Sequence, residues 1–166
     1  PGAKVKPANV VYIGLKDLDQ AEIDIIRQKK ITTFTAMDIA RLGLEPVCEA
    51  ISKLQKNVSK IWVSLDVDSI DALYAPATPM LNKGGLTYRE ITTLGQYIGK
   101  TCSLAGFEIV EFAPDRDKNN LTGQLIIELV ARLLGTEHTW YTDYMDEEAK
   151  KQSRRGERLI DAVHKS

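Results

Sequence analysis

Short β-branched apolar segments alternate with longer segments of helical periodicity along most of the chain. Four segments predict strands: 9–14, 31–36, 60–68 and 104–114. Apolar residues at three- and four-residue spacing predict helices in segments 17–30, 37–42, 45–57, 87–101 and 121–135. Consecutive strands joined through helices pair in parallel by right-handed crossovers. The sequence therefore predicts an α/β fold, with a parallel sheet covered by helices on both faces.

The sequence also indicates where helices begin and which face they bury. Pro46 suits a first helical turn, and Thr87 and Glu90 have the spacing of a capping box. In segment 121–135 we expect one buried face to consist of Ile126, Ile127, Val130, Leu133 and Leu134, with Gly135 ending the helix.

The length of 166 residues suits one domain. We expect residues 1–136 to form its α/β part. The charged segment 137–166 is predicted to be a polar tail, either a solvated helix or an arm for oligomer contacts. With 22 basic against 23 acidic residues and no basic stripe, nothing electrostatic favours nucleic acid or a membrane surface as a partner, so a small polar ligand is expected.

The cysteines bear on cellular location, and the start of the chain bears on whether it is complete. Cys48 and Cys102 lie far apart in apolar surroundings without metal or redox spacing, so we interpret them as buried thiols in a reducing compartment and predict a cytoplasmic location. No segment approaches the roughly 20 apolar residues of a membrane span. The chain opens at Pro1 with neither a signal-like segment nor a start methionine, and we expect it to be a fragment.

Carboxylates follow three of the predicted strands. They are Asp17 and Asp19 after the first, Asp66 and Asp68 at the end of the third, and Glu111 at the end of the fourth. Parallel sheets bind ligands beyond the carboxyl ends of their strands. We therefore expect these groups to meet along one acidic edge.

Asp66 and Asp68 are the most informative pair. Side chains alternate across a strand, so both point to one side, about 7 Å apart. Their charges repel, which favours either a proton on one carboxylate or a hard cation such as magnesium, calcium or manganese between them. The alternative is a solvated strand end, with each aspartate accepting backbone hydrogen bonds.

Four segments in order, "VYIGLKDLDQAE", "SLDVDSIDALYAPAT", "GGLTYRE" and "FEIVEFAP", together resemble the carboxyl-terminal half of the arginase family, the manganese ureohydrolases. The resemblance covers most of residues 10–117. It implies an arginase-like three-layer sandwich, of which residues 1–136 form the carboxyl-terminal half.

The resemblance implies a role for each acidic residue. Asp66 and Asp68 would be ligands of two manganese ions, and Glu111 would contact the guanidinium group of the substrate. Asp19, with Glu22, would face the α-amino group of arginine. Asp19 and Glu22 also have capping-box spacing, and the two roles can coexist.

The implied function is part of a binuclear-manganese ureohydrolase that converts L-arginine to L-ornithine and urea. Two divalent ions that share a water lower its pKa and supply hydroxide, which attacks the guanidinium carbon. The substrate would be arginine or a related guanidino compound, and a homo-oligomer is expected. Asp17 and Asp71 are interpreted as residues that orient a loop or a neighbouring group.

The family's further histidine and aspartate ligands come from Asp-His and Asp-Ala-His-x-Asp patterns, which this chain lacks. Its two histidines, His138 and His164, lie in the polar tail and are interpreted as surface residues. We therefore expect the amino-terminal half to be absent from this chain or supplied by another one, and the isolated chain to be inactive.

The loop after the third strand departs from the family pattern Pro-Ala-Thr-Gly-Thr-Pro. Thr78 is kept and is predicted to bind substrate, whereas Met80 replaces the second threonine, and Glu108 stands where arginases tend to carry aspartate. These departures support an alternative function, a non-catalytic arginase-like subunit or regulatory protein. A phosphatase of the haloacid dehalogenase type is ranked below both, because its Asp-x-Asp motif normally lies on the first strand. An EF-hand is excluded, since Ile70 occupies a ligand position.

Overall fold

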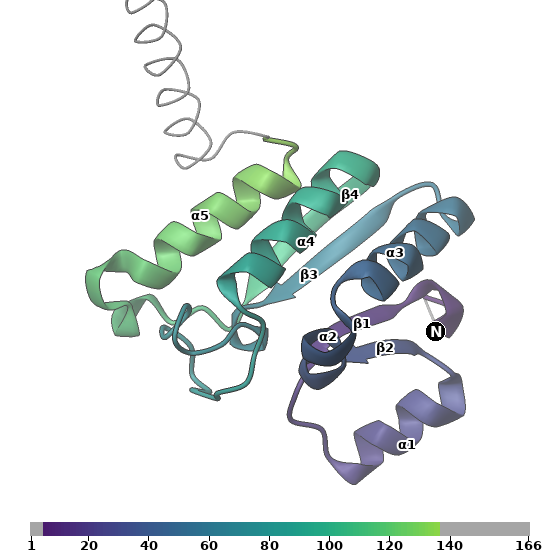
Figure 1. Ribbon diagram of the computed structural model, residues 1–166, viewed down its shortest axis with the longest axis horizontal. Coiled ribbons are helices and arrows are strands. Elements are labelled where there is room, and N and C mark those ends of the chain that lie inside the picture. Colours follow the sequence, from purple (N-terminus) through teal and green to yellow (C-terminus); the bar gives the residue numbers. More distant parts are fainter. Residues whose placement is uncertain (1–4, 137–166) are drawn as a thin grey trace, which may run out of the picture. The chain divides into compact units, whose positions relative to one another are not determined.

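The computed structural model describes residues 5–136, in which strands and helices alternate (Figure 1). In chain order the strands and α-helices are β1 (Val11–Leu15), α1 (Gln20–Lys29), β2 (Thr32–Thr35), α2 (Ala36–Leu42), α3 (Glu45–Asn57), β3 (Ile61–Asp66), α4 (Tyr88–Thr101), β4 (Leu104–Val110) and α5 (Leu121–Leu133). Every predicted strand and helix is present. The predicted tail, residues 137–166 with both histidines, lies outside the described residues.

All strand pairing in the described part of the chain is parallel. β1 pairs with β2, and β3 pairs with β4 in a register that places Asp66 opposite Val110. The predicted α/β fold with parallel strands is therefore confirmed. Its strands form two separate two-stranded sheets, β1–β2 and β3–β4, instead of one continuous ladder.

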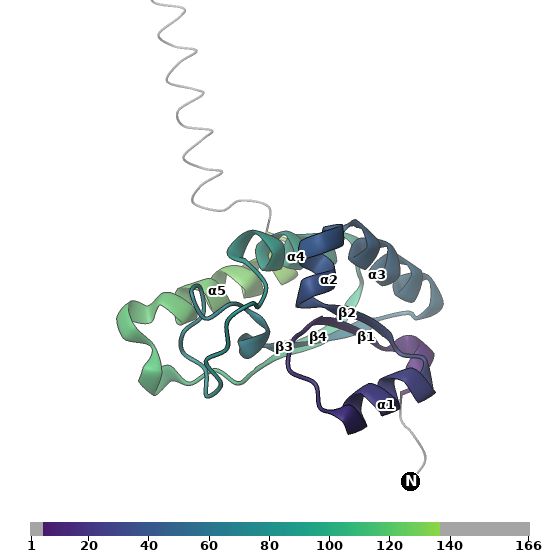
Figure 2. The ribbon, with the colours of Figure 1, turned by 60° about the horizontal axis from the view of Figure 1, so that its bottom comes forward.

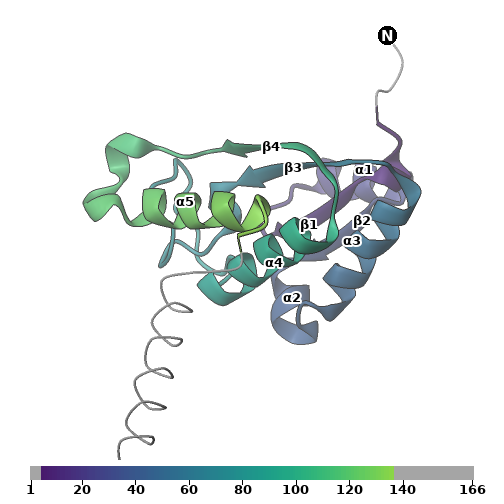
Figure 3. The same ribbon diagram turned by 90° about the horizontal axis from the view of Figure 1, so that it is seen from above.

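Helices lie on both faces of these strands, as predicted. Figures 2 and 3 show α2, α3, α4 and α5 on one face and α1 on the other, beside β1 and β2. None of the described helices combines the length and apolar character needed to cross a membrane.

The hydrophobic core lies between the strands and the larger helical layer. Its buried members come from α2, α3, α4, α5 and the segment after β3, and side chains of all four strands pack against it. The helix starts follow the sequence signals. Thr87 caps α4 in a capping box with Glu90, and Pro46 lies in the first turn of α3.

The predicted buried face of α5 is only partly correct. Ile127 and Leu134 are 71% and 70% exposed. The buried residues are instead Thr122, Leu125, Leu129 and Leu133, spaced three and four positions apart. Because apolar residues occur on more than one side of α5, periodicity alone did not identify the face that meets α4.

Both cysteines are free and half-buried. Burial raises the pKa of the Cys48 thiol. Their predicted status as thiols agrees with the structure, while their burial is less complete than expected.

Candidate functional site

The end of β3 brings Asp66 and Asp68 together. The chain leaves the strand in a short 3-10 turn, Val67–Ser69, whose Val67 side chain is fully buried in the core. Asp66 Oδ1 accepts a hydrogen bond from the Asp68 amide at 3.0 Å, and the Ser69 hydroxyl donates to the Asp66 carbonyl at 2.7 Å. The buried valine thus anchors the turn, and both carboxylates are half-buried beside it.

The surroundings of Asp68 make its negative charge unfavourable. Burial raises the pKa of Asp68, and the neighbouring Asp66 carboxylate raises it further. The positive charge of Lys16, the residue after β1, lowers the pKa of Asp68. A divalent cation would relieve the repulsion between the two carboxylates more strongly than a single ammonium group does.

Glu111 lies at the same end of the neighbouring strand. It directly follows Val110, the residue paired with Asp66, so Glu111 and Asp66 occupy adjacent strand ends. The backbone of Glu111 has φ of 58°, in the left-handed region that non-glycine residues rarely adopt. This conformation turns the chain sharply after β4, and such strain is concentrated at functional sites.

Asp19 and Glu22 form the capping box of α1. Asp19 Oδ1 accepts from the Glu22 amide at 2.8 Å, and Glu22 Oε2 accepts from the Asp19 amide at 2.9 Å. The structural role considered for these residues is therefore confirmed. Each carboxylate has a second oxygen, and both side chains are exposed, so a ligand can still be bound.

Thr78 is fully buried, and its hydroxyl is engaged within its own loop. Thr78 Oγ1 accepts from the Met80 amide at 3.0 Å and lies 3.2 Å from the Met80 carbonyl oxygen, to which it can donate. Arg116 donates to the Thr78 carbonyl at 3.2 Å. These contacts define a role in loop structure, and the predicted contact with substrate stays a prediction.

Four residues hold the loops beside the aspartate pair, and sequence reasoning singled out two of them, Asp17 and Asp71. The Lys16 ammonium donates to the Asn82 carbonyl at 3.3 Å, and the Asn82 amide group donates to Asp17 Oδ2. Asp71, interpreted from sequence as an orienting residue, accepts from the amides of Leu73 and Gly84 at 2.9 and 2.7 Å. The only sequence signal for Lys16 was its position next to Asp17 at a strand end; Asn82 had none.

The donor set fits a metal ion in part. Two half-buried carboxylates are suitable ligands for a hard divalent cation, and manganese accepts such oxygen ligands. In residues 5–136 no group of three or more histidine, cysteine, aspartate or glutamate side chains is arranged to hold a metal. Asp66 and Asp68 can therefore provide part of a coordination sphere, and further ligands must come from elsewhere.

Known proteins resemble the chain over this same region. The model of the arginase family matches residues 2–135. An arginase of Plasmodium berghei is 38% identical over 150 residues, which cover 80% of this chain and 42% of the relative. The chain spans less than half the length of such curated relatives.

Solved structures agree with the sequence comparison. The arginase of Bacillus caldovelox superposes with a TM-score of 0.78 at 34% identity, over 82% of this chain and 46% of that one. The arginase of Entamoeba histolytica, solved in complex with L-ornithine, has a TM-score of 0.74 at 29% identity, over 80% of this chain and 45% of that one. The likeness thus extends from sequence to fold.

Proposed function

The chain belongs to the arginase family, and from this premise we propose that it forms part of a binuclear-manganese ureohydrolase that hydrolyses L-arginine to L-ornithine and urea. The observation that carries the proposal is the placement of Asp66 and Asp68 side by side at the end of β3, with Glu111 at the adjacent end of β4.

In this proposal Asp66 and Asp68 hold manganese. The bound ions would supply a hydroxide nucleophile at neutral pH. The Val67 anchor and the hydrogen bond between Asp66 Oδ1 and the Asp68 amide keep the two carboxylates in place before an ion arrives. Pre-positioned ligands lower the cost of forming a metal site.

Glu111 and the start of α1 are proposed to bind the substrate. The Glu111 carboxylate would pair with the guanidinium group, and Asp19 and Glu22 would face the α-amino group. The L-ornithine bound in the Entamoeba histolytica arginase supports an amino-acid product for this chain as well.

A manganese titration by calorimetry tests the metal site. Asp66→Asn and Asp68→Asn should each weaken Mn²⁺ binding by about tenfold or more, because each removes a charged ligand. Asp24→Asn is the matched control: this exposed carboxylate lies within α1 and accepts from Gln20 at 2.9 Å. Equal Mn²⁺ affinities in all four proteins would overturn the assignment of Asp66 and Asp68.

Catalysis needs ligands beyond these two, so this chain alone is proposed to be inactive. Incubation with manganese and L-arginine should release no urea above the metal-only background. Urea release at a rate typical of a complete enzyme would contradict this part of the proposal. A homo-oligomer and a cytoplasmic location stay predictions.

A non-catalytic arginase-like subunit is the second candidate. Two observations favour it. Met80 replaces a threonine of the family pattern, and the Thr78 hydroxyl is already hydrogen-bonded to the Met80 backbone. Under this alternative the assembled, manganese-loaded protein would bind L-arginine without releasing urea. Urea release by that assembly would support the enzyme.

A further inference from the structure

Two loops meet at the carboxyl ends of strands that belong to different sheets. One runs from Lys16 to Asp19, between β1 and α1, and the other follows β3 from Asp71 to Leu86. The β1–β2 and β3–β4 sheets share no backbone ladder, so side chains and loops must set the spacing between them. At this point the spacing depends on contacts between the two loops.

Lys16, Asp17 and Asn82 make these contacts, and we call them the inter-loop contact. Asn82 takes part twice, through its carbonyl oxygen with the Lys16 ammonium at 3.3 Å and through its side-chain amide with Asp17 Oδ2. The first of these hydrogen bonds is partly buried. A residue held at both its backbone and its side chain can neither slide nor rotate without losing a hydrogen bond.

The base of the second loop is closed independently. Leu86 donates to the Ser69 carbonyl and accepts from the Asp71 amide, each at 2.9 Å, and its side chain packs against Gly14 of β1. Asp71 accepts from the Gly84 amide. The inter-loop contact is thus the polar link at the loop's far end, while Leu86 secures its base.

The inter-loop contact joins the loop that leads to Asp19 with the loop that follows Asp66 and Asp68. We therefore expect a change in the inter-loop contact to alter the separation between Asp66 and Asp68 at one end of the site and Asp19 at the other.

We propose that Asn82 is a positioning residue which, through Lys16 and Asp17, sets this separation and thereby selects the chain length of the guanidino amino acid. The inference rests on the proposed function. It assigns Asn82, Lys16 and Asp17 no contact with substrate. Their effect is to hold Asp19 and Glu22 at the distance from Asp66 and Asp68 that an amino acid with three methylene groups, as in arginine, can span.

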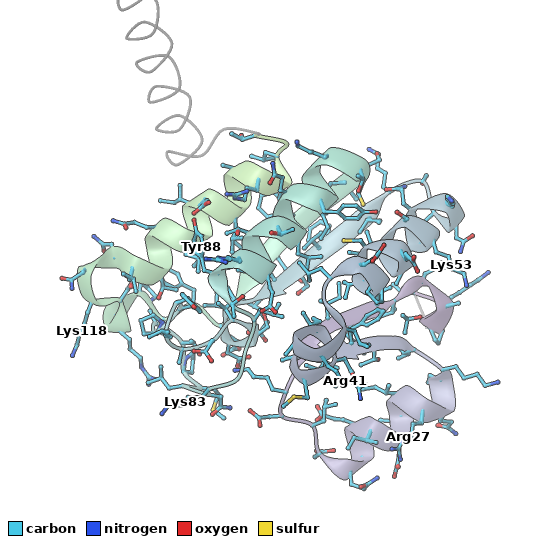
Figure 4. The ribbon with its side chains drawn as sticks, viewed as in Figure 1. Arg27, Arg41, Lys53, Lys83, Tyr88 and Lys118 are labelled. Carbon is cyan, nitrogen blue, oxygen red and sulfur yellow. The ribbon has the colours of Figure 1, made fainter. Side chains whose placement is uncertain are left out.

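The first experiment tests the inter-loop contact without any ligand. Trypsin cleaves after Lys83, which is exposed next to Asn82, and the cut after exposed Lys118 in another loop is an internal reference (Figure 4). Asn82→Ala and Asp17→Ala should each raise cleavage after Lys83 by about 2- to 10-fold, the effect of losing one hydrogen bond. Asp17→Asn keeps an acceptor oxygen and should restore nearly the original rate.

A double-mutant cycle makes this test specific. If Asn82 and Asp17 act through one hydrogen bond, the double alanine variant should be cleaved no faster than the faster single variant. Multiplicative effects, or no effect, would overturn the inter-loop contact. Asp115→Ala, at an exposed carboxylate outside both loops, is the control and should leave the cleavage rate unchanged.

The second experiment tests selection by length. The assembled, manganese-loaded protein is titrated by calorimetry with L-arginine and with its homologues one methylene shorter and longer. Asn82→Ala should reduce the preference for L-arginine by about 3- to 10-fold, because a less restrained site discriminates length less sharply. An unchanged preference in a variant that trypsin cleaves faster would overturn the positioning role. If the unmodified protein binds none of the three compounds, the proposed function is wrong and the proposed length selection is wrong with it. The double-mutant cycle of trypsin cleavage tests the inter-loop contact independently of that outcome.

Discussion

Gly99 of α4 lies so close to Arg132 of α5 that a Cβ atom on Gly99 would overlap the Arg132 carbonyl oxygen. The two helices can approach to this distance only because position 99 has no side chain. Backbone atoms cannot move aside as a flexible side chain can, so the contact restricts position 99 to glycine.

Gly99→Ala should therefore separate α4 from α5 and lower the free energy of unfolding by about 1–3 kcal/mol or more, the usual cost of overpacking. Gly95→Ala, one turn earlier on α4, is the matched control. Its Cβ would lie 3.6 Å from a Leu129 methyl group, an ordinary contact, and alanine favours a helix over glycine by about 0.5–1 kcal/mol. Urea unfolding of both variants checks the prediction, and equal destabilisation would contradict it.

Leu129 and Ile127 distinguish the two faces of α5. Leu129 is 1% exposed in the core, whereas Ile127 is 71% exposed. Leu129→Ala should lower the free energy of unfolding by about 2–5 kcal/mol through lost burial and a cavity. Ile127→Ala should change it by less than about 0.5 kcal/mol. Thermal and urea unfolding measure both, and a large loss in Ile127→Ala would indicate that another element covers this face.

Asp117 caps the start of α5. Its two carboxylate oxygens accept from the amides of Thr122 at 3.0 Å and Gly123 at 2.8 Å. Asp117→Ala leaves these amides without their acceptor and should cost about 1 kcal/mol of folding free energy. Asp115→Ala is the nearby exposed control, expected to have no measurable effect. Equal unfolding midpoints for the two variants would argue against the cap.

Tyr88 links α4 to α5 and gives a pH-dependent prediction. Its hydroxyl donates to Glu128 Oε2 at 2.7 Å. Burial, followed by this hydrogen bond, raises the pKa of Tyr88 above its usual value near 10. Because the folded pKa is above the unfolded one, the stabilisation is fully present below about pH 10 and is lost as the pH rises through the folded pKa.

Tyr88→Phe should lower the free energy of unfolding at neutral pH by about 0.5–1.5 kcal/mol. The variant should also lack the loss of stability that ionisation of Tyr88 causes at high pH. The free energies of unfolding of wild type and variant should therefore converge above pH 10. Unfolding by urea between pH 7 and 11 measures this, with exposed Tyr12→Phe as the control. Parallel curves for wild type and Tyr88→Phe across this range would contradict the prediction.

Much of the fold was predictable because local signals and global architecture agree. The strand and helix segments and the Thr87–Glu90 and Asp19–Glu22 capping boxes follow from residue spacing within short windows. The parallel pairing follows from the alternation of those segments along the chain. The neighbouring position of Asp66 and Asp68 was predictable for the same reason. Two residues separated by one along the chain are close in any fold.

Relationships between distant segments were not contained in such windows. The buried face of α5 depends on where α4 packs, and the restriction at Gly99 depends on a backbone carbonyl 33 positions later. The division of the strands into two sheets and the meeting of Asn82 with Lys16 and Asp17 depend on how separate loops approach each other. Local spacing encodes turns, strands and helix ends, because these need only neighbouring atoms. Contacts between distant segments are selected by close packing of the whole chain, which acts only after those segments have come together.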